Sequence, residues 1–427
     1  MNKEEFNELL KHKLKHNGQR SLSVFKWTVF AIFTGLFVGA FSSTFGFVMA
    51  RATALRTAHP WFIYSLPFMG LVIVLLYKAI LKEKDGGTNV VISAIQSDKE
   101  LPVRMAPLIF ISTVLTHLAG GSAGREGAAL QMGGAIGNGI GRLFHFNSTD
   151  KKTMIMCGMS ASFSALFGTP MAAAIFSMEV VSVGIMHYAA LVPCVISSII
   201  ASEVSRKLFG LHVDNFDIDM IPYFGVKNAV IISIFAVACG LISIAFCMFM
   251  HKFEEYYSVT FKNPYVKAFV GGTSVLILTL LVGDQTYNGT GADVIASCFN
   301  GAANITLATF LLKILFTTIT LSCGYKGGEI VPTLFIGATF GAAIGKLIGF
   351  SPSLMAAVGM GALFCGVTNC PITSLLICFE LFGYDAMPYY LLAIAFSYWV
   401  SGYYGLYKSQ KIVYSKYKSN YIDKAVK

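Results

Sequence analysis

The chain has 427 residues, of which 55% are apolar and 13% are charged, and its mean hydropathy is +0.66. In soluble domains about a quarter of the residues are charged, so this composition excludes an ordinary soluble globular protein. The net charge of +10 does not indicate a nucleic-acid partner, because the positive residues gather at the two ends of the chain and in short loops. The sequence therefore predicts an all-α, multi-pass membrane protein.

Ten apolar runs recur along the chain. In order, they cover residues 24–50, 61–81, 105–118, 154–167, 188–201, 229–250, 268–282, 306–322, 333–350 and 387–404. Several are shorter than the roughly 20 residues that a straight crossing needs. We therefore expect partial, broken and tilted helices, which are tolerated at membrane depth where they are buried in protein or line a cavity.

The two ends of the chain are polar and basic. Residues 1–20 are predicted to form an N-terminal helix on the membrane surface, and residues 408–427 a C-terminal helix and tail. Lysine and arginine collect on the cytoplasmic side of membrane proteins, so both termini are expected in the cytoplasm of a protein of the cell membrane. The nine cysteines show neither CxxC nor Cys/His metal spacing, so we predict no metal site and no cofactor.

Three segments occur twice, in the same order. GGTNVVISAI from Gly86 matches GTGADVIASC from Gly289, GREGA matches GGEIV, and FGTPMAAAIFSMEVV matches TNCPITSLLICFELF. This repetition predicts a first membrane repeat at 21–207, a linker at 208–222 and a second repeat at 223–407. Repeated membrane halves usually meet at a site near the bilayer midplane, built from helices that stop partway.

One glutamate lies in each of two matching Gly-rich breaks. Glu126 follows GGSAGR and Glu329 follows GYKGG. Ionisable residues inside a membrane are expensive and mark functional sites. A helix that begins at such a break directs free N–H groups and its positive dipole end into the interior, which attracts anions. The sequence therefore predicts an anion site around these breaks.

The segments GREGA (Gly124–Ala128), GEIVP (Gly328–Pro332) and GTNVV (Gly87–Val91), with the FGTP…ME segment around Pro170, resemble the signature segments of the CLC family of anion channels and anion/proton exchangers. The resemblance spans nearly the whole chain. It implies two inverted repeats, a homodimer with a pore in each subunit, and transport of chloride or fluoride with protons.

The resemblance also implies residue roles. Glu126 resembles the external gating glutamate, Thr88 occupies the position of an anion-binding residue, and Tyr414 resembles the inner-gate tyrosine. The residues expected to gate the pore or carry protons are Glu126 and Glu329. Those expected to bind the anion are Gly87, Thr88, Asn89, Gly124, Arg125, Gly127, Gly328, Ile330, Val331 and Tyr414.

Several positions depart from the family pattern. Val180 stands where proton-exchanging chloride members have an internal glutamate, whereas Glu329 in the second signature resembles the fluoride/proton branch. That branch commonly has methionine at the position of Thr88 and threonine at that of Val331. The sequence thus predicts a chloride channel or chloride/proton exchanger, with fluoride/proton antiport as the alternative.

Each of these residues also has a structural interpretation. Glu126 would then pair with Arg125 or Arg104, and Glu329 would be held by local N–H groups or by Lys326. Thr88 would cap its helix, and Tyr414 would anchor the tail at the interface. Glu179 and Glu380, in equivalent places, are expected to play paired structural roles.

An enzymatic alternative rests on GGSAG around Ser122, with His117 close by. This segment formally matches the GxSxG nucleophile elbow, which needs a strand that leads into a sharp turn. Here the segment follows an apolar run, so the sequence predicts that the protein is not an enzyme. Gly133, Gly137 and Gly141 recur every four residues and predict a face for close helix packing.

Overall fold

Helices dominate the structure, a computed structural model that describes residues 3–81, 86–97, 99–211, 216–301 and 305–427. The first half contains α1 (Lys3–Ala58), α2 (Leu66–Ile80), α3 (Thr88–Gln96), α4 (Met105–Leu118), α5 (Glu126–Leu143), α6 (Ser148–Phe167), α7 (Pro170–Glu179) and α8 (Leu191–Phe209). The second half contains α9 (Val226–Thr260), α10 (Pro264–Val282), α11 (Ala292–Phe299), α12 (Leu307–Ser322), α13 (Ile330–Ile348), α14 (Pro352–Thr368), α15 (Pro371–Phe382) and α16 (Met387–Val400).

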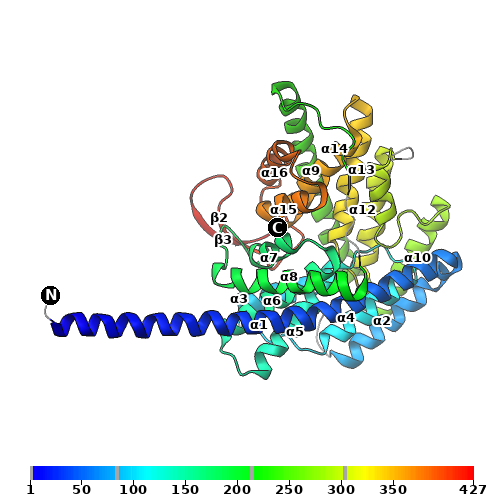
Figure 1. Cartoon of the computed structure of the whole chain (residues 1–427). Helices are drawn as coiled ribbons and strands as arrows, with labels where there is room; N and C mark the ends of the chain where they lie inside the picture. Colours follow the sequence, from blue (N-terminus) through cyan, green and yellow to red (C-terminus); the bar gives the residue numbers. More distant parts are fainter. Residues whose placement is uncertain (1–2, 82–85, 98, 212–215, 302–304) are drawn as a thin grey trace.

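Short and long helices recur in the same order in the two halves. The short helices α3 and α7, of 9 and 10 residues, correspond to α11 and α15, of 8 and 12 residues. This confirms the predicted broken helices. In Figure 1, α3 to α8 lie together in the lower part of the molecule, and α12 to α16 lie in the upper part. Among the described residues, six helices are long and apolar enough to cross a bilayer.

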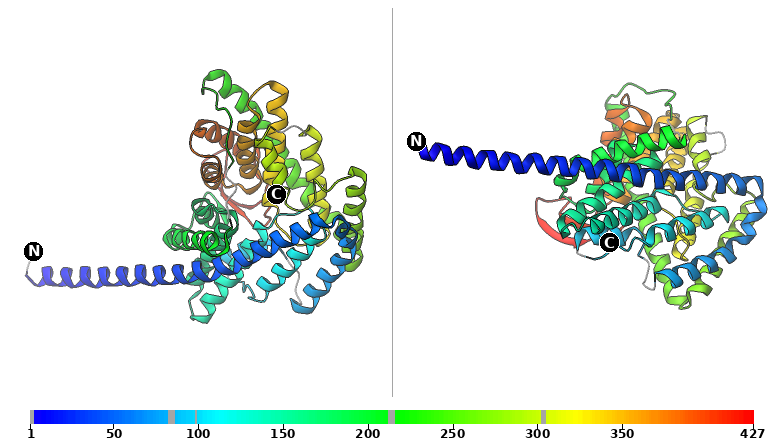
Figure 2. Two further views of the ribbon diagram at one scale, coloured as in Figure 1. Left: turned by 45° about the vertical axis from the view of Figure 1, so that its right-hand side comes forward. Right: turned by 60° about the horizontal axis from the view of Figure 1, so that its bottom comes forward.

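The ends of the chain differ from the prediction. The N-terminal stretch is not a separate surface helix, because α1 runs without a break from Lys3 to Ala58, and its N-terminal end projects beyond the rest of the molecule (Figures 1 and 2). The predicted helix within residues 408–427 is wrong. These residues form β2 (Lys411–Tyr414) and β3 (Tyr421–Ala425), since β2 pairs with β3 and with β1 (Ser182–Val183). The predicted linker falls partly on residues 212–215, outside the described residues.

Two carboxylates join the halves by capping each other's helices. Glu179, at the end of α7, accepts hydrogen bonds from the N–H groups of Ile372 (3.1 Å) and Thr373 (2.8 Å) at the start of α15. Glu380, near the end of α15, accepts from the N–H groups of Met171 (2.9 Å) and Ala172 (2.8 Å) at the start of α7. Negative charge at a helix N-terminus is stabilising. The predicted paired structural roles of these two acids are confirmed.

Glycines allow the helices of each half to pack backbone to backbone. A Cβ placed on Gly133 of α5 would overlap the Gly158 carbonyl oxygen of α6, and one on Gly137 would overlap that of Met154. In the second half, Gly337 of α13 meets Gly359 of α14 in the same way. Small residues permit such close approach in membrane bundles, so the predicted packing face is confirmed at Gly133 and Gly137.

We expect Gly133→Ala to destabilise the protein by about 1–3 kcal/mol, the usual effect of overpacking. Gly225→Ala is the control, because a Cβ there would lie 3.6 Å from its nearest neighbour, Tyr223. Thermal unfolding in detergent would compare the two variants. An unchanged midpoint for Gly133→Ala would contradict the proposed close contact between α5 and α6.

Candidate anion site

The two Gly-rich breaks are joined by a short backbone bridge. The N–H of Gly124 donates to the carbonyl of Gly328 at 2.6 Å, and the N–H of Gly328 donates to that of Gly124 at 2.7 Å. A Cβ on Gly328 would overlap the backbone nitrogen of Gly127, so this crossing requires glycine. The bridge brings the starts of α5 and α13, which are about 200 positions apart in sequence, to one place.

The bridge places two helix N-termini side by side. α5 begins at Glu126 and α13 at Ile330, and their residues from Gly127 to Leu130 and from Ile330 to Leu334 are buried. The first N–H groups of a helix have no partner within the helix, and the helix dipole makes that end positive. Two such ends create a region that favours an anion without a fixed positive charge at its centre.

Two cavities reach this region. The α3 cavity, of about 180 Å³, is lined by Gly87, Thr88, Asn89, Gln131 and Glu329 among others. The α11 cavity, of about 360 Å³, is lined by Arg125, Glu126, Thr290, Ala292 and Val331 among others. The α11 cavity is also lined by Thr53 of α1, and the α3 cavity by Tyr77 of α2. The two cavities share no lining residue.

Glu126 faces the α11 cavity and is bound to its neighbour. Its side chain is 2% exposed, and its Oε1 lies 3.3 Å from Arg125 Nε while its Oε2 accepts from the Arg125 N–H at 3.0 Å. Arg125 is thus the partner, as the structural interpretation predicted, and no contact between Glu126 and Arg104 is seen among the described residues. The carboxylate occupies the positive end of its own helix, where an anion would also bind.

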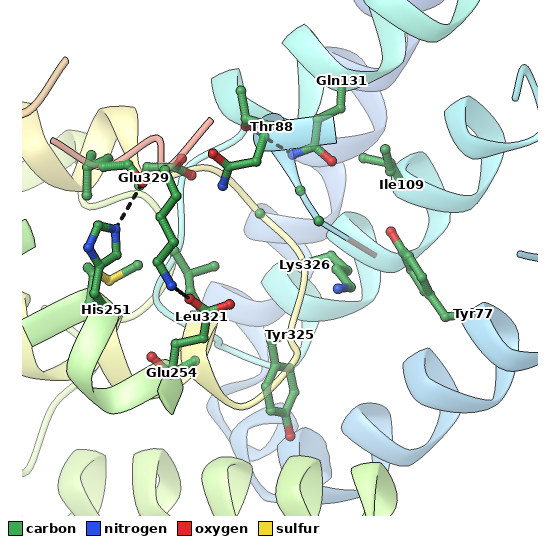
Figure 3. Close-up of a pocket in the computed structure, with 18 residues that line it drawn as sticks. Tyr77, Thr88, Ile109, Gln131, His251, Glu254, Leu321, Tyr325, Lys326 and Glu329 are labelled. Carbon is green, nitrogen blue, oxygen red and sulfur yellow. Dashed lines mark hydrogen bonds and ion pairs between the residues drawn. The ribbon is translucent and has the colours of Figure 1, made fainter. Parts of the chain in front are cut away.

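Glu329 faces the other cavity. It is the N-cap residue of α13 and lines the α3 cavity, and its Oε2 lies 3.3 Å from the position that a Cβ on Gly127 would take. Figure 3 shows that Thr88, Gln131 and Glu329 gather at one end of this cavity, whereas Glu254 and Tyr325 lie toward the other. The Lys326 ammonium lies 4.4 Å from the centroid of the Tyr77 ring. The two glutamates therefore flank the bridge, one in each cavity.

Four more of the predicted residues lie at the start of α3 or in the first turn of α13. Thr88 is buried and its Oγ1 accepts from Gln131 Nε2 at 3.3 Å, while Gly87, with a φ of 57°, is the N-cap of α3. Thr88 is therefore not the cap. The Asn89 side chain accepts from the N–H of Ser409 at 2.9 Å, so it holds the C-terminal segment. Ile330 is 1% exposed within the core.

Tyr414 is not brought to this site. It lies on β2, is 46% exposed, and contacts the Tyr421 ring edge-on at 5.9 Å. Tyr407 is closer to the site than Tyr414. It is 1% exposed, and its hydroxyl has no hydrogen-bond partner among the described residues. Its neighbours Leu406 and Lys408 line the α3 cavity.

Tyr407 and Gln131 belong to this region but are not among the residues predicted from the sequence. A buried hydroxyl without a partner is unusual, so Tyr407 is a candidate hydrogen-bond donor to an anion. Gln131, 6% exposed, fixes the hydroxyl of Thr88. The available signal was weak in both cases: Gln131 lies five positions after Glu126, and Tyr407 is one of several tyrosines near the C-terminus.

These features define a helical membrane protein with a candidate anion site between two cavities. Residues 69–402 match the family model described as voltage gated chloride channel. The chain belongs to this family.

Several known proteins are similar to the chain. The chloride/fluoride channel protein of Pseudomonas syringae pv. tomato is 33% identical over 92% of this chain and 88% of its own length. The H(+)/Cl(-) exchange transporter ClcA of Vibrio cholerae is 27% identical over 65% of this chain and 62% of its own. A crystal structure of a CLC-type fluoride/proton antiporter superposes with a TM-score of 0.88 at 28% identity, covering 91% of this chain and 98% of that one. A slow cyanobacterial Cl-/H+ antiporter, 20% identical, shares the fold with a TM-score of 0.76, over 88% of this chain and 94% of its own.

Proposed function

We propose that the protein exchanges a halide for protons, with fluoride as the preferred anion. The observation that carries this proposal is the Glu329 carboxylate at the bridge. In addition, the chain has Val180 at the position where proton-exchanging chloride members of the family have an internal glutamate. The similarity to a fluoride/proton antiporter and to a chloride/fluoride channel protein supports it. Glu126 and Glu329 then carry the proton and compete with the anion.

In this mechanism the anion passes between the α3 and α11 cavities through the region of the two helix starts. An ionised Glu126 occupies this region in place of the anion. On protonation the side chain no longer mimics an anion, so it leaves the positive helix end and the path opens. Anion binding by backbone N–H groups alone is weak enough to permit release, which conduction requires.

Chloride transport, which the sequence alone favours, is the second candidate. The Thr88 hydroxyl favours it, because the fluoride branch commonly has methionine there. The test uses vesicles that contain the purified protein and are loaded with fluoride or chloride. A fluoride electrode and a chloride electrode measure the release of each halide, and a pH electrode measures the movement of protons. Fluoride should leave faster than chloride and drive protons uphill into the vesicle. Equal halide rates without proton movement would reject fluoride/proton antiport.

The geometry around Ser122 supports transport over hydrolysis. Ser122 is 0% exposed and its Oγ lies 3.0 Å from Thr317 Oγ1. The ring nitrogens of His117 lie 2.9 Å from the carbonyl oxygens of Thr113 and Ala123. His117 is therefore engaged by backbone and does not reach Ser122 as a base. Ser122→Ala should retain halide flux in the same vesicles.

We also propose that the protein is a homodimer with both termini in the cytoplasm, so that the α3 cavity opens inward. The basic residues at both ends support this orientation, and the resemblance to the family supports the dimer. Light scattering that gives the mass of one chain would contradict the dimer. Removal of a C-terminal tag by protease added to intact cells would contradict the orientation.

A further inference from the structure

A further cavity, lined by charged residues, lies away from the α3 and α11 cavities. This basic cavity, of about 120 Å³, is lined by residues that follow α3, by the end of α5 and by the start of α6, including Lys99, Glu100, Arg142, Lys151 and Lys152. α3 and α5 begin at the anion site, with Thr88 and Glu126, and the basic cavity lies at their other ends. Neither the α3 cavity nor the α11 cavity shares a residue with it.

The lining of the basic cavity carries an excess of positive charge. Among the described residues that line it, four side chains are cationic and one, Glu100, is acidic, and Lys152 has a partner of its own. The Glu100 carboxylate lies 3.5 Å from Arg142 Nη2, but both side chains are exposed, at 72% and 43%, so this ion pair is weak. Asp150, in the first turn of α6, pairs instead with Lys26 at 2.5 Å. Without Lys152, three cations of the lining still face one described acid, so the excess of positive charge does not depend on Lys152.

The surroundings place the basic cavity at the surface of the bilayer. Phe144 and Phe146, in the loop between α5 and α6, pack edge-on against Phe30 at 4.9 and 4.7 Å, and Trp27 contacts Phe146 at 6.0 Å. Lys26 lies 4.3 Å from the centroid of the Phe146 ring. Tryptophan is enriched at the membrane–water interface, and lysines near the ends of membrane helices reach it, as Trp27 and Lys26 would here; this end of α1 is the one that we propose faces the cytoplasm.

Apolar side chains next to the basic cavity are exposed. Leu143, directly after Arg142, is 69% exposed, and Phe144 is 47% exposed. A ligand that carries a negative group into the cavity and apolar chains along Leu143 and Phe144 would fit both surfaces. Anionic phospholipids have this combination, and basic pockets between membrane helices on the cytoplasmic side bind their headgroups.

We propose that the basic cavity binds the phosphate group of an anionic phospholipid of the inner leaflet. Arg142 and Lys151 contact the phosphate, and Leu143 and Phe144 contact the acyl chains. The bound lipid would hold the far ends of α5 and α6 together, on the helices that position Glu126.

The test is lipid binding by native mass spectrometry of the purified full chain, with dioctanoyl phosphatidylglycerol, dioctanoyl phosphatidylcholine and inorganic phosphate as probes. The wild type should retain phosphatidylglycerol in preference to phosphatidylcholine. Arg142→Gln and Lys151→Gln should each weaken this retention about fivefold. Lys252→Gln is the matched control, since Lys252 is an exposed lysine of α9 outside the basic cavity, and it should retain the lipid like the wild type.

Three outcomes would overturn the proposal. Equal retention of the two lipids would show that charge does not select the ligand. Unchanged phosphatidylglycerol binding in the Arg142→Gln, Lys151→Gln double variant would place the lipid elsewhere. Inorganic phosphate that binds as tightly as phosphatidylglycerol would assign the cavity to soluble phosphate. Halide flux of the variants at the wild-type rate in vesicles confirms that they are folded, and this readout separates the lipid site from the proposed transport.

Discussion

Glu126→Gln should transport halide at a rate that no longer responds to pH. The wild-type carboxylate occupies the positive end of α5 when ionised, and glutamine has nearly the same shape but cannot carry the charge. Where Glu126 is mostly ionised, wild-type flux should rise by up to about tenfold for each unit of acidification. The variant should be open across the same range. Vesicles monitored with halide and pH electrodes would measure both rates.

Glu380→Gln is the control for this experiment. Glu380 is a partly buried acid that caps α7 and lines neither the α3 nor the α11 cavity. Its replacement should leave the pH response in place even if it lowers stability. A Glu126→Gln protein that keeps the wild-type pH response would show that Glu126 is only the structural partner of Arg125.

Glu329→Gln should separate halide movement from proton movement. If Glu329 carries the proton through the α3 cavity, its neutral analogue still permits halide to pass but removes the site that binds and releases the proton. We expect proton movement per halide to fall by about a hundredfold, a typical effect of losing a positioned proton carrier. A pH electrode under an imposed fluoride gradient would report the loss.

A second carboxylate in the same cavity provides the control for Glu329. Glu254 also lines the α3 cavity, but it is 56% exposed and pairs with Lys408 at 2.7 Å. Glu254→Gln should therefore keep proton coupling. Normal coupling in Glu329→Gln would instead support the alternative in which local backbone groups or Lys326 hold this acid.

The parts of the fold that depend on local sequence could be predicted. The Gly-rich breaks predict the helix starts at Glu126 and Ile330, since glycine permits the close crossing of Gly124 and Gly328. The matched positions of Glu179 and Glu380 predict equivalent roles for the two acids. What the pattern did not show is that each acid caps a helix of the other half, because that partner lies about 200 residues away.

The C-terminal part of the site could not be read from the sequence. Tyr414 and Tyr407 are seven residues apart among several tyrosines, and only the path of the chain decides which one is buried. That path depends on distant contacts, such as the Gln410 side chain donating to the Val180 carbonyl at 3.0 Å and the Ser409 N–H donating to Asn89. Lys411–Tyr414 becomes a strand for the same reason, since β1 lies about 230 residues earlier in the chain and provides its partner.

The two caps that Glu179 and Glu380 form across the halves also set an order of events during synthesis. The N–H groups of Met171 and Ala172 are made early, yet the carboxylate that binds them belongs to Glu380, which follows Met171 by 209 residues. Until the ribosome has added that residue, the first half of the chain contains a helix end without its final partner. Neither half, released alone, contains all the groups that complete its own structure. The native arrangement of α7 and α15 is therefore reached only after nearly the entire protein has entered the bilayer.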